Sequence, residues 1–456
     1  MKIFMGLLLS MVIGISLQAD WKVAGNALKA SDEFSGDWFG YSVDISENYA
    51  IIGAPHESMG GAIYIFKRDS NGDWVEMQKI DATDATIVAS SQFNSSDVVA
   101  LSSFGSDVAI GEAVSTSVNP SMLVIGASNT SVYHNDTNVY TGAFCTYELN
   151  ITTDIWQQQE KCVMGLVSNT NGSSASGFGT SVDISNWKDG LNSYAKIING
   201  DPYYDGQKYT NIGLIAFYSY SSSNWNLVNL ALGSGGAAAS SNVYFGKSVA
   251  IHKNTAVVGA TGYNIYDPND DDPDSVMVIH EVGAAHFFTS SGTLINTYTP
   301  AHEETEGKHN FGMSVDIYGD YSIVSEKHRE GGTTSPAAYI MKRGVDGNWT
   351  QHNYIENSTV GYGTSVAIND THAAVGALNA PAVGAAYMYK KDSNGDWNTY
   401  EPFYWLDNAK RTASGIDVAL YENNLMVGAP LVEEVKQFEY IPDNSMSTSV
   451  LMYLLN

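Results

Sequence analysis

A short motif that begins with Phe-Gly recurs along the whole chain and constrains the fold more than any other feature. The first copy reads FGYSVDI from Phe39, and the later copies keep the glycine and the alternating strand that follows it. The seven copies begin at Phe39, Phe104, Phe178, Phe245, Phe311, Tyr362 and Ser414. Recurrence of one supersecondary unit along a chain is typical of repeat architectures, in which each unit packs against the next.

Each copy continues with three further strands in a fixed order. The second strand most often ends in Gly-Ala, as in AIIGAP from Ala50; copies three and five keep this strand but lack the Gly-Ala pair. The third alternates apolar and polar residues, and the fourth opens with tryptophan in most copies. Four short strands per copy, rich in β-branched and aromatic residues, predict an all-β fold: a seven-bladed β-propeller of four-stranded antiparallel blades.

The two ends of the chain predict how the ring closes. DWKV from Asp20 resembles a fourth strand with no strands before it, and SVLMYLL near the C-terminus resembles a third strand with none after it. Residues 21–28 are therefore expected to complete the last blade, which removes open sheet edges. Residues 20–456 then form a single propeller domain.

The paired motifs FG and GAP resemble the FG-GAP repeat family, which also builds the seven-bladed propeller of integrin α subunits. The resemblance implies extracellular ligand recognition or adhesion more than catalysis. Calcium-binding members carry a D-x-D-x-D-G loop between the first and second strands. Here that connection is short, as in SENY and HKNT, so the resemblance carries no calcium ligands over to these positions.

Charge and the N-terminal segment bound the setting of the protein. The chain has 49 acidic and 22 basic residues and a formal net charge of -27, which disfavours nucleic acid as a partner. Residues 1–19 have a lysine followed by an apolar core, as in a secretory signal peptide. No later run reaches the roughly 20 apolar residues of a membrane span. We therefore expect a secreted or cell-surface protein.

The chain has two cysteines, Cys145 and Cys162. Aligning the repeats places them on adjacent antiparallel strands of the second blade. In an oxidising compartment they are expected to form a disulfide that links the outer strands of that blade.

Long connections between second and third strands emerge on one end of a propeller and give this end the best candidate ligand site. Tyrosine and histidine side chains suit stacking on sugars or contact with proteins. The candidate ligand-binding residues are Tyr133, His134, Tyr140, Tyr203, Tyr204, Tyr263 and Tyr266.

The expected function is recognition or adhesion through binding of an extracellular protein or glycan; the alternatives are a lectin-like carbohydrate binder and a propeller glycosidase or lyase. No catalytic motif is complete, so we expect no enzyme and no catalytic residues.

Two sets of carboxylates are candidates for cation binding. Asp44, Asp183 and Asp316 share one position on the innermost strands. There they could gather a cation or a polar ligand in the central channel; alternatively, each accepts hydrogen bonds from neighbouring turns or is hydrated. The run YDPNDDDPD concentrates negative charge that calcium would neutralise. Its carboxylates are Asp267, Asp270, Asp271, Asp272 and Asp274.

The stretch DSNGDW at residues 69–74 returns at residues 392–397 and has the alternating oxygen ligands of a calcium loop. Asn-Gly is also a strong turn signal. The equivalent turns in other copies lose the carboxylates but keep the tryptophan, so we interpret DSNGDW as a turn between third and fourth strands.

Overall fold

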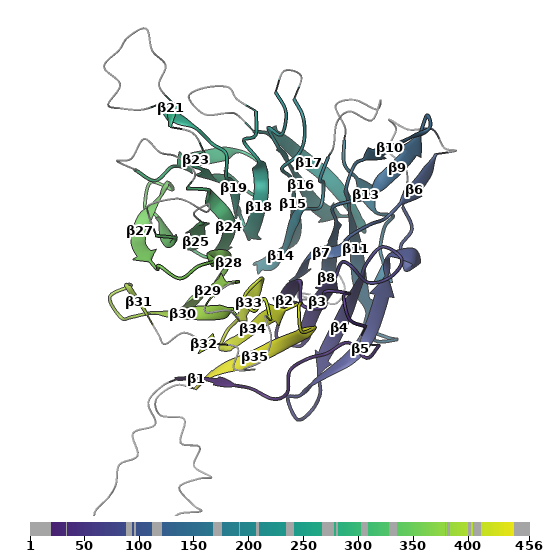
Figure 1. Cartoon of the computed structure of the whole chain (residues 1–456), viewed down its shortest axis with the longest axis horizontal. Helices are drawn as coiled ribbons and strands as arrows, with labels where there is room; N and C mark the ends of the chain where they lie inside the picture. The colour runs from purple at the N-terminus through teal and green to yellow at the C-terminus, as the bar shows by residue number, and fades with distance from the viewer. Residues whose placement is uncertain are drawn as a thin grey trace, which may run out of the picture.

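The computed structural model describes most of the chain between residues 20 and 441. The described residues are 20–32, 34–87, 94, 97–111, 121–166, 176–190, 192–206, 209–233, 241–266, 278–279, 281–301, 309–327, 335–378, 380, 384–399, 403–404 and 412–441. Among them, seven antiparallel sheets have four or more strands, and we number these sheets 1 to 7 in chain order. The predicted fold class, a β-propeller of four-stranded antiparallel sheets, is confirmed (Figure 1).

The sheets follow the repeats. Sheet 1 contains β2 (Ser42–Ile45), β3 (Tyr49–Ala54), β4 (Ala62–Arg68) and β5 (Trp74–Asp81). Sheet 2 contains β7 (Phe104–Gly111), β8 (Met122–Ala127), β11 (Ala143–Asn150), β12 (Ile155–Gln158) and β13 (Val163–Met164). Sheet 3 contains β14 (Ser181–Asp189), β15 (Asn192–Asp201), β16 (Leu214–Ser221) and β17 (Asn224–Leu232). Sheet 4 contains β18 (Phe245–His252), β19 (Thr255–Ala260), β22 (Ala284–Thr289) and β23 (Leu294–Tyr298).

The second half continues in the same order. Sheet 5 contains β24 (Phe311–Tyr318), β25 (Tyr321–Glu326), β26 (Ala337–Arg343) and β27 (Trp349–Glu356). Sheet 6 contains β28 (Tyr362–Ile368), β29 (His372–Ala377), β30 (Ala385–Lys391), β31 (Trp397–Thr399) and β32 (Phe403–Tyr404). Sheet 7 contains β33 (Val418–Tyr421), β34 (Asn424–Ala429), β35 (Glu434–Ile441) and the N-terminal strand β1 (Asp20–Val23). The first strand of each sheet lies nearest the centre in Figure 1.

Sheet 7 joins the two ends of the chain. Strand β1 pairs with β35, with Asp20 opposite Ile441 and Val23 opposite Phe438 (Figure 1). The sequence-based prediction that SVLMYLL is the third strand of this sheet was wrong. The third strand is β35, which pairs with β34 and β1. SVLMYLL lies outside the described residues. Three charged residues among the eight of β35 hide the strand pattern, although Val435, Phe438 and Tyr440 are buried.

Pairs of glycines explain why Phe-Gly and Gly-Ala recur together. A Cβ atom added to Gly259 at the end of β19 would lie 2.0 Å from the carbonyl oxygen of Gly312 in the next sheet. The equivalent pairs, at 2.1–2.3 Å, are Gly53–Gly105, Gly126–Gly179, Gly200–Gly246, Gly376–Gly415 and Gly428–Gly40. Copy three lacks the alanine of the Gly-Ala pair but keeps the glycine, as Gly200. Sheet 5 alone has another residue at this position, Ser325. Adjacent sheets approach so closely there that a side chain would collide with backbone.

The core lies between adjacent sheets and is aromatic. Phe311, for example, is fully buried and packs edge-on against Tyr339, with ring centroids 4.9 Å apart. The predicted disulfide between Cys145 and Cys162 is confirmed, and it links β11 to the segment that precedes β13.

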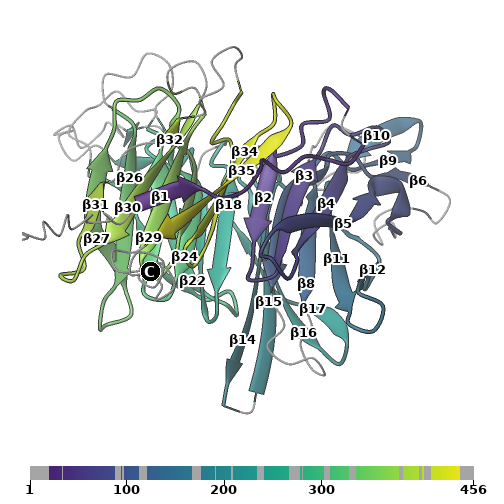
Figure 2. The same cartoon turned by 90° about the horizontal axis from the view of Figure 1, so that it is seen from below.

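Small elements outside the seven sheets lie on the connections. Strands β6 (Val98–Ala100), β9 (Ser131–His134) and β10 (Thr137–Tyr140) form a three-stranded sheet, so part of the long connection expected in sheet 2 is a β-hairpin. Strands β20 (Ile265–Tyr266) and β21 (Val278–Ile279) pair with each other, and η1 (Ala82–Asp84) is a single 3-10 turn. Figure 2 shows β9 and β10 at one end of the molecule and the long β14–β15 hairpin at the other. We call the end that carries β9 and β10 the loop face.

Candidate functional site

The predicted tyrosines occupy different environments on the loop face. Tyr133 and Tyr140 are about half exposed, at 50% and 49%, and lie on one face of the β6–β9–β10 sheet together with Val98. No charged residue belongs to this solvent-facing row, which is Val98, Ala100, Ser131, Tyr133, Asn138 and Tyr140. It is an uncharged surface in a strongly acidic chain.

The other predicted residues are less available to a ligand. His134 is buried, with its Nδ1 atom 2.7 Å from the carboxylate of Asp97, so it holds the hairpin rather than facing solvent. Tyr204 and Tyr263 are half-buried against the cores of their sheets. Tyr266 lies in β20, and its side chain is outside the described residues.

Tyr203 takes part in a pocket of about 430 Å³ on the loop face. The pocket lies between sheets 3, 4 and 5, because Tyr203 follows β15, Tyr244 precedes β18 and Asn310 precedes β24. The rings of Tyr203 and Tyr244 meet edge to face with centroids 6.1 Å apart. The remaining lining residues are Asn242, Lys247, Thr261, Gly262, Glu281 and Asn310. We call this the Tyr203–Tyr244 pocket.

Hydrogen bonds fix the backbone that carries the pocket residues. The Asn242 Oδ1 atom accepts a hydrogen bond of 2.8 Å from the Asn211 side chain, and the Glu281 N–H donates to Asn264 at 2.9 Å. Both segments are anchored to neighbouring connections in this way. Pocket walls that are held before a ligand arrives lower the entropy lost on binding.

Lys247 supplies a cation in this mostly polar pocket. Burial lowers the pKa of the Lys247 ammonium. Burial also lowers the pKa of Lys327, and the nearby charge of Lys247 adds to that effect. A desolvated ammonium gains more than an exposed one when a ligand oxygen accepts its hydrogen bond.

Tyr203 is tied to the sheet that carries Tyr140. The buried Asp201 carboxylate accepts hydrogen bonds from the N–H groups of Gly177, at 2.7 Å, and Tyr203, at 3.2 Å. The adjacent Ser176 N–H donates to the Tyr140 carbonyl oxygen at 3.0 Å. Hydrogen bonds therefore connect the tyrosine surface of the β6–β9–β10 sheet to the segment that carries Tyr203.

The predicted carboxylates at the centre of the molecule bridge adjacent sheets. Asp183 accepts hydrogen bonds from the Ile184 N–H of its own strand, at 2.7 Å, and from the Ile251 N–H of sheet 4, at 2.6 Å. Asp44 and Asp316 make the same pair of bonds, reaching sheets 2 and 6. Hydrogen-bond acceptance, one of the two alternatives for these residues, is thus what the geometry shows.

Two further bridging carboxylates were missed. Asp107 accepts from Val182 of sheet 3, and Asp417 accepts from Val43 of sheet 1, each at 2.7 Å. Both stand at the fourth position of their motif, in FGSDVAI and SGIDVAL, where the other copies have serine. The sixth position is alanine in those two copies, so aligning the repeats could have found them.

Burial raises the pKa of these five bridging carboxyl groups. The pKa values of Asp44, Asp107 and Asp316 are raised to about 7. Those of Asp183 and Asp417 are raised well above the usual range by burial, with added repulsion from other bridging carboxylates. The backbone N–H bonds act in the opposite direction because they favour the charged form.

The predicted calcium ligands Asp267, Asp270, Asp271, Asp272 and Asp274 lie outside the described residues, and calcium binding there stays a prediction. Within the described residues there is no group of three or more His, Cys, Asp or Glu side chains able to hold a metal ion. The stretch at Asp69–Trp74 is a turn, as expected: the Asp69 carboxylate accepts from the N–H groups of Asn71 and Asp73, at 2.8 and 3.0 Å.

A calcium titration tests the acidic run. If it binds calcium, adding the ion at about 100 times its Kd to chelated protein should stabilise the fold by about 2.7 kcal/mol and raise the melting temperature. The double variant Asp271→Asn/Asp272→Asn should lose this rise. Asp396→Asn, in the second DSNGDW turn, should keep it. Equal melting temperatures with calcium and with chelator would exclude the site.

Comparison with known proteins agrees with the repeat pattern. The family model for the FG-GAP repeat matches residues 25–66 and 237–278. No curated protein matches the sequence. In the part of the chain that the structure describes, no helix is long and apolar enough to cross a membrane.

Three of the solved structures with similar folds have 9–12% sequence identity to this chain and TM-scores below 0.5, so they support no argument about activity. A putative 6-phosphogluconolactonase from Bacteroides uniformis has 9% identity and a TM-score of 0.47, over 80% of this chain and 85% of that one. The Dos1 propeller has 11% identity and a TM-score of 0.44, over 86% and 76%. An ancestral GH74 enzyme has 12% identity and a TM-score of 0.47, over 94% of this chain and 51% of that one. The family match confirms that the chain contains FG-GAP repeats.

Proposed function

We propose that the protein is a secreted or cell-surface recognition protein that binds a glycan in the Tyr203–Tyr244 pocket. The observation that carries the proposal is the composition of this pocket: two tyrosine rings beside amide, carboxylate and ammonium groups. Aromatic faces stack on the apolar faces of sugar rings, and planar polar side chains bind their hydroxyl groups. Its volume of about 430 Å³ lies in the range of small-ligand pockets.

The setting supports an extracellular role. FG-GAP repeats are typical of extracellular proteins, and residues 1–19 have the pattern of a secretory signal. The disulfide between Cys145 and Cys162 fits an oxidising compartment. These features agree with recognition or adhesion at a cell surface.

The pocket supports binding rather than glycoside cleavage. Glycosidases use two carboxyl groups on either side of the scissile bond. Among the described residues that line the pocket, the acidic side chain is Glu281. A single carboxylate can bind sugar hydroxyls but does not supply both an acid and a base or nucleophile.

Glycan binding and its dependence on Tyr203 test the proposal. We expect a glycan array to show selective binding, and Tyr203→Ala to weaken the best ligand about tenfold, since an aromatic contact contributes roughly 0.5–1.5 kcal/mol beyond its buried area. Tyr133→Ala is the matched control, because Tyr133 is exposed on the same face but outside the pocket.

Two results would contradict this proposal. One is the absence of glycan binding on the array while a protein ligand is captured from the surface fraction of the source cells. The other is loss of glycan binding in Tyr133→Ala with full binding in Tyr203→Ala, which would move the site to the β6–β9–β10 sheet.

A further inference from the structure

At two interfaces between adjacent sheets, one side-chain amide bonds both the backbone N–H and the backbone C=O of a tryptophan in the next sheet. The Gln78 side chain of sheet 1 accepts a hydrogen bond from the Trp156 N–H of sheet 2, at 2.8 Å, and donates to the Trp156 carbonyl oxygen, at 2.9 Å. Asn296 of sheet 4 does the same for Trp349 of sheet 5, at 2.9 and 3.0 Å. Each amide thus satisfies the two outward backbone groups of a tryptophan near the start of a fourth strand.

Trp74 presents the same pair of backbone groups at the interface between sheets 7 and 1. Trp74 lies opposite Arg68 of β4, and the Arg68 N–H donates to the Asn48 carbonyl oxygen, on the side of β4 away from β5. In an antiparallel pair the residues alternate between bonded and non-bonded positions, so the N–H and C=O of Trp74 point away from β4, toward sheet 7. They have the orientation that Gln78 and Asn296 recognise elsewhere.

At this interface the position that corresponds to Gln78 is occupied by glycine, which has no side-chain amide. Gln78 follows Trp74 of the outer strand of sheet 1 by four residues. In sheet 7 the corresponding tryptophan of the outer strand is Trp21, and the residue four after it is Gly25. No side chain in the described part of the chain bonds to the Trp74 backbone at this interface. In place of the amide there is a groove of about 750 Å³ that both Gly25 and Trp74 line.

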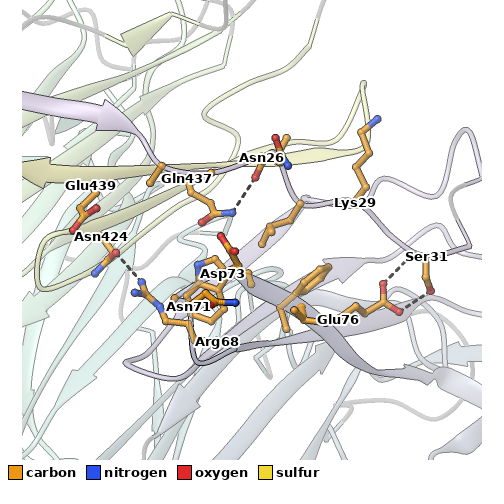
Figure 3. Close-up of a pocket in the computed structure, with 18 residues that line it drawn as sticks. Asn26, Lys29, Ser31, Arg68, Asn71, Asp73, Glu76, Asn424, Gln437 and Glu439 are labelled. Carbon is orange, nitrogen blue, oxygen red and sulfur yellow. Dashed lines mark hydrogen bonds between the residues drawn. The ribbon is translucent and has the colours of Figure 1, made fainter.

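The groove leaves Trp74 accessible. Trp74 is half-buried, whereas Trp156, Trp225, Trp349 and Trp397 are buried. The Arg68 guanidinium lies over the indole of Trp74, 4.6 Å from the ring centroid, and donates a 2.7 Å hydrogen bond to Asn424. Figure 3 shows Asn71, Asp73, Gln437 and Asn26 gathered around the same groove. We call it the seam groove.

We propose that the seam groove binds a side-chain carboxamide, from an asparagine or glutamine of a partner polypeptide, against the backbone N–H and C=O of Trp74. The molecule itself provides the template, because a primary carboxamide already makes this pair of bonds to Trp156 and to Trp349. A primary amide carries its donor and its acceptor on the same side, which a secondary trans amide does not. The seam groove is independent of the Tyr203–Tyr244 pocket.

A titration with a short peptide tests the proposal. The probe is acetyl-Gly-Gln-Gly methylamide, and its control replaces the glutamine with methionine, which has a similar shape but no amide. With the full chain we expect the glutamine peptide to shift the backbone amide resonance of Trp74. The methionine peptide should bind about tenfold or more weakly, since the two hydrogen bonds of the amide are absent.

A variant of Gly25 provides the second arm. Gly25→Asn introduces an amide four residues after Trp21, the spacing at which Gln78 follows Trp74, and asparagine tolerates the positive φ of 70° at this position. This variant should no longer bind the glutamine peptide and should melt at a higher temperature. Gly190→Asn is the matched control: it has a φ of 59° and no described atom within 4 Å of an added Cβ. It should bind the peptide like the unaltered chain.

Three outcomes would overturn the proposal. The first is a Trp74 amide resonance that the glutamine peptide does not shift. The second is equal shifts with the glutamine and methionine peptides. The third is a Gly25→Asn variant that binds the glutamine peptide as well as Gly190→Asn does.

Discussion

Replacing Gly259 with alanine is expected to lower the free energy of unfolding by about 3 kcal/mol, at the upper end of the usual range for overpacked sites. The added Cβ would lie 2.0 Å from the Gly312 carbonyl oxygen and 2.4 Å from the Ser248 hydroxyl oxygen. The hydroxyl can rotate away, but the carbonyl belongs to backbone. Sheets 4 and 5 must therefore separate, which exposes part of the core between them. Urea unfolding followed by circular dichroism measures the change.

Sheet 5 supplies the control for this prediction. Ser325 occupies the position of the glycine there, and its Cβ is 3.2 Å from the Cβ position of Gly363 in the next sheet. This interface already accommodates a Cβ atom. Ser325→Ala keeps that atom and removes only the hydrogen bonds of the hydroxyl with the Ser314 N–H and carbonyl, at 3.0 and 3.3 Å, so it should cost about 1 kcal/mol. A Gly259→Ala variant as stable as Ser325→Ala would show that the glycine pairs do not set the spacing of the sheets.

Replacing Asp183 with alanine is expected to destabilise the protein by about 2–5 kcal/mol, because two backbone N–H groups lose their acceptor at once. These are the Ile184 N–H, at 2.7 Å, and the Ile251 N–H of the next sheet, at 2.6 Å. Lys188→Ala, on the exposed end of the same strand, is the control and should have little effect. A loss below about 0.5 kcal/mol in Asp183→Ala would mean that water replaces the carboxylate without cost.

The effect of this substitution should depend on pH. Since the pKa of Asp183 is raised in the folded protein, the folded state holds its proton at pH values where the unfolded state has released it. The contribution of Asp183 to stability is therefore largest below the unfolded pKa of about 4 and falls as pH rises toward the folded pKa. Asp183→Ala should cost more stability at pH 5 than at pH 8. The opposite order would show that the two N–H bonds outweigh burial.

The repeated strands could be predicted because each carries its own local pattern. Phe-Gly and Gly-Ala mark backbone positions that allow no side chain, so the spacing of these motifs indicates the order of the strands. Strand β35 was missed because its charges mask the alternation, while SVLMYLL has a stronger apolar pattern. The sheet of β6, β9 and β10 was also missed, since β6 comes from a connection some 30 residues before its partner β9.

The candidate site could be predicted only in part. Tyr203 was named from the length of its connection, but Tyr244 and Lys247 lie on either side of the Phe-Gly pair of sheet 4 and look like repeat residues. They meet Tyr203 because the loop face brings the start of one sheet against the second-to-third connection of the previous one. The seam groove depends on the absence of a side chain at Gly25. The sequence does not indicate this effect, because Gly25 and Trp74 come together only when sheets 7 and 1 pack side by side.

The pairing of β1 with β35 also determines the order in which the protein can fold. Among the described strands β1 is synthesised first, yet its partner ends at Ile441. Contacts between residues so distant in sequence form late, because a long loop must close before they contribute. Strand β1 must therefore remain unpaired while the other six sheets are synthesised, so the earliest of the described strands is among the last to pair.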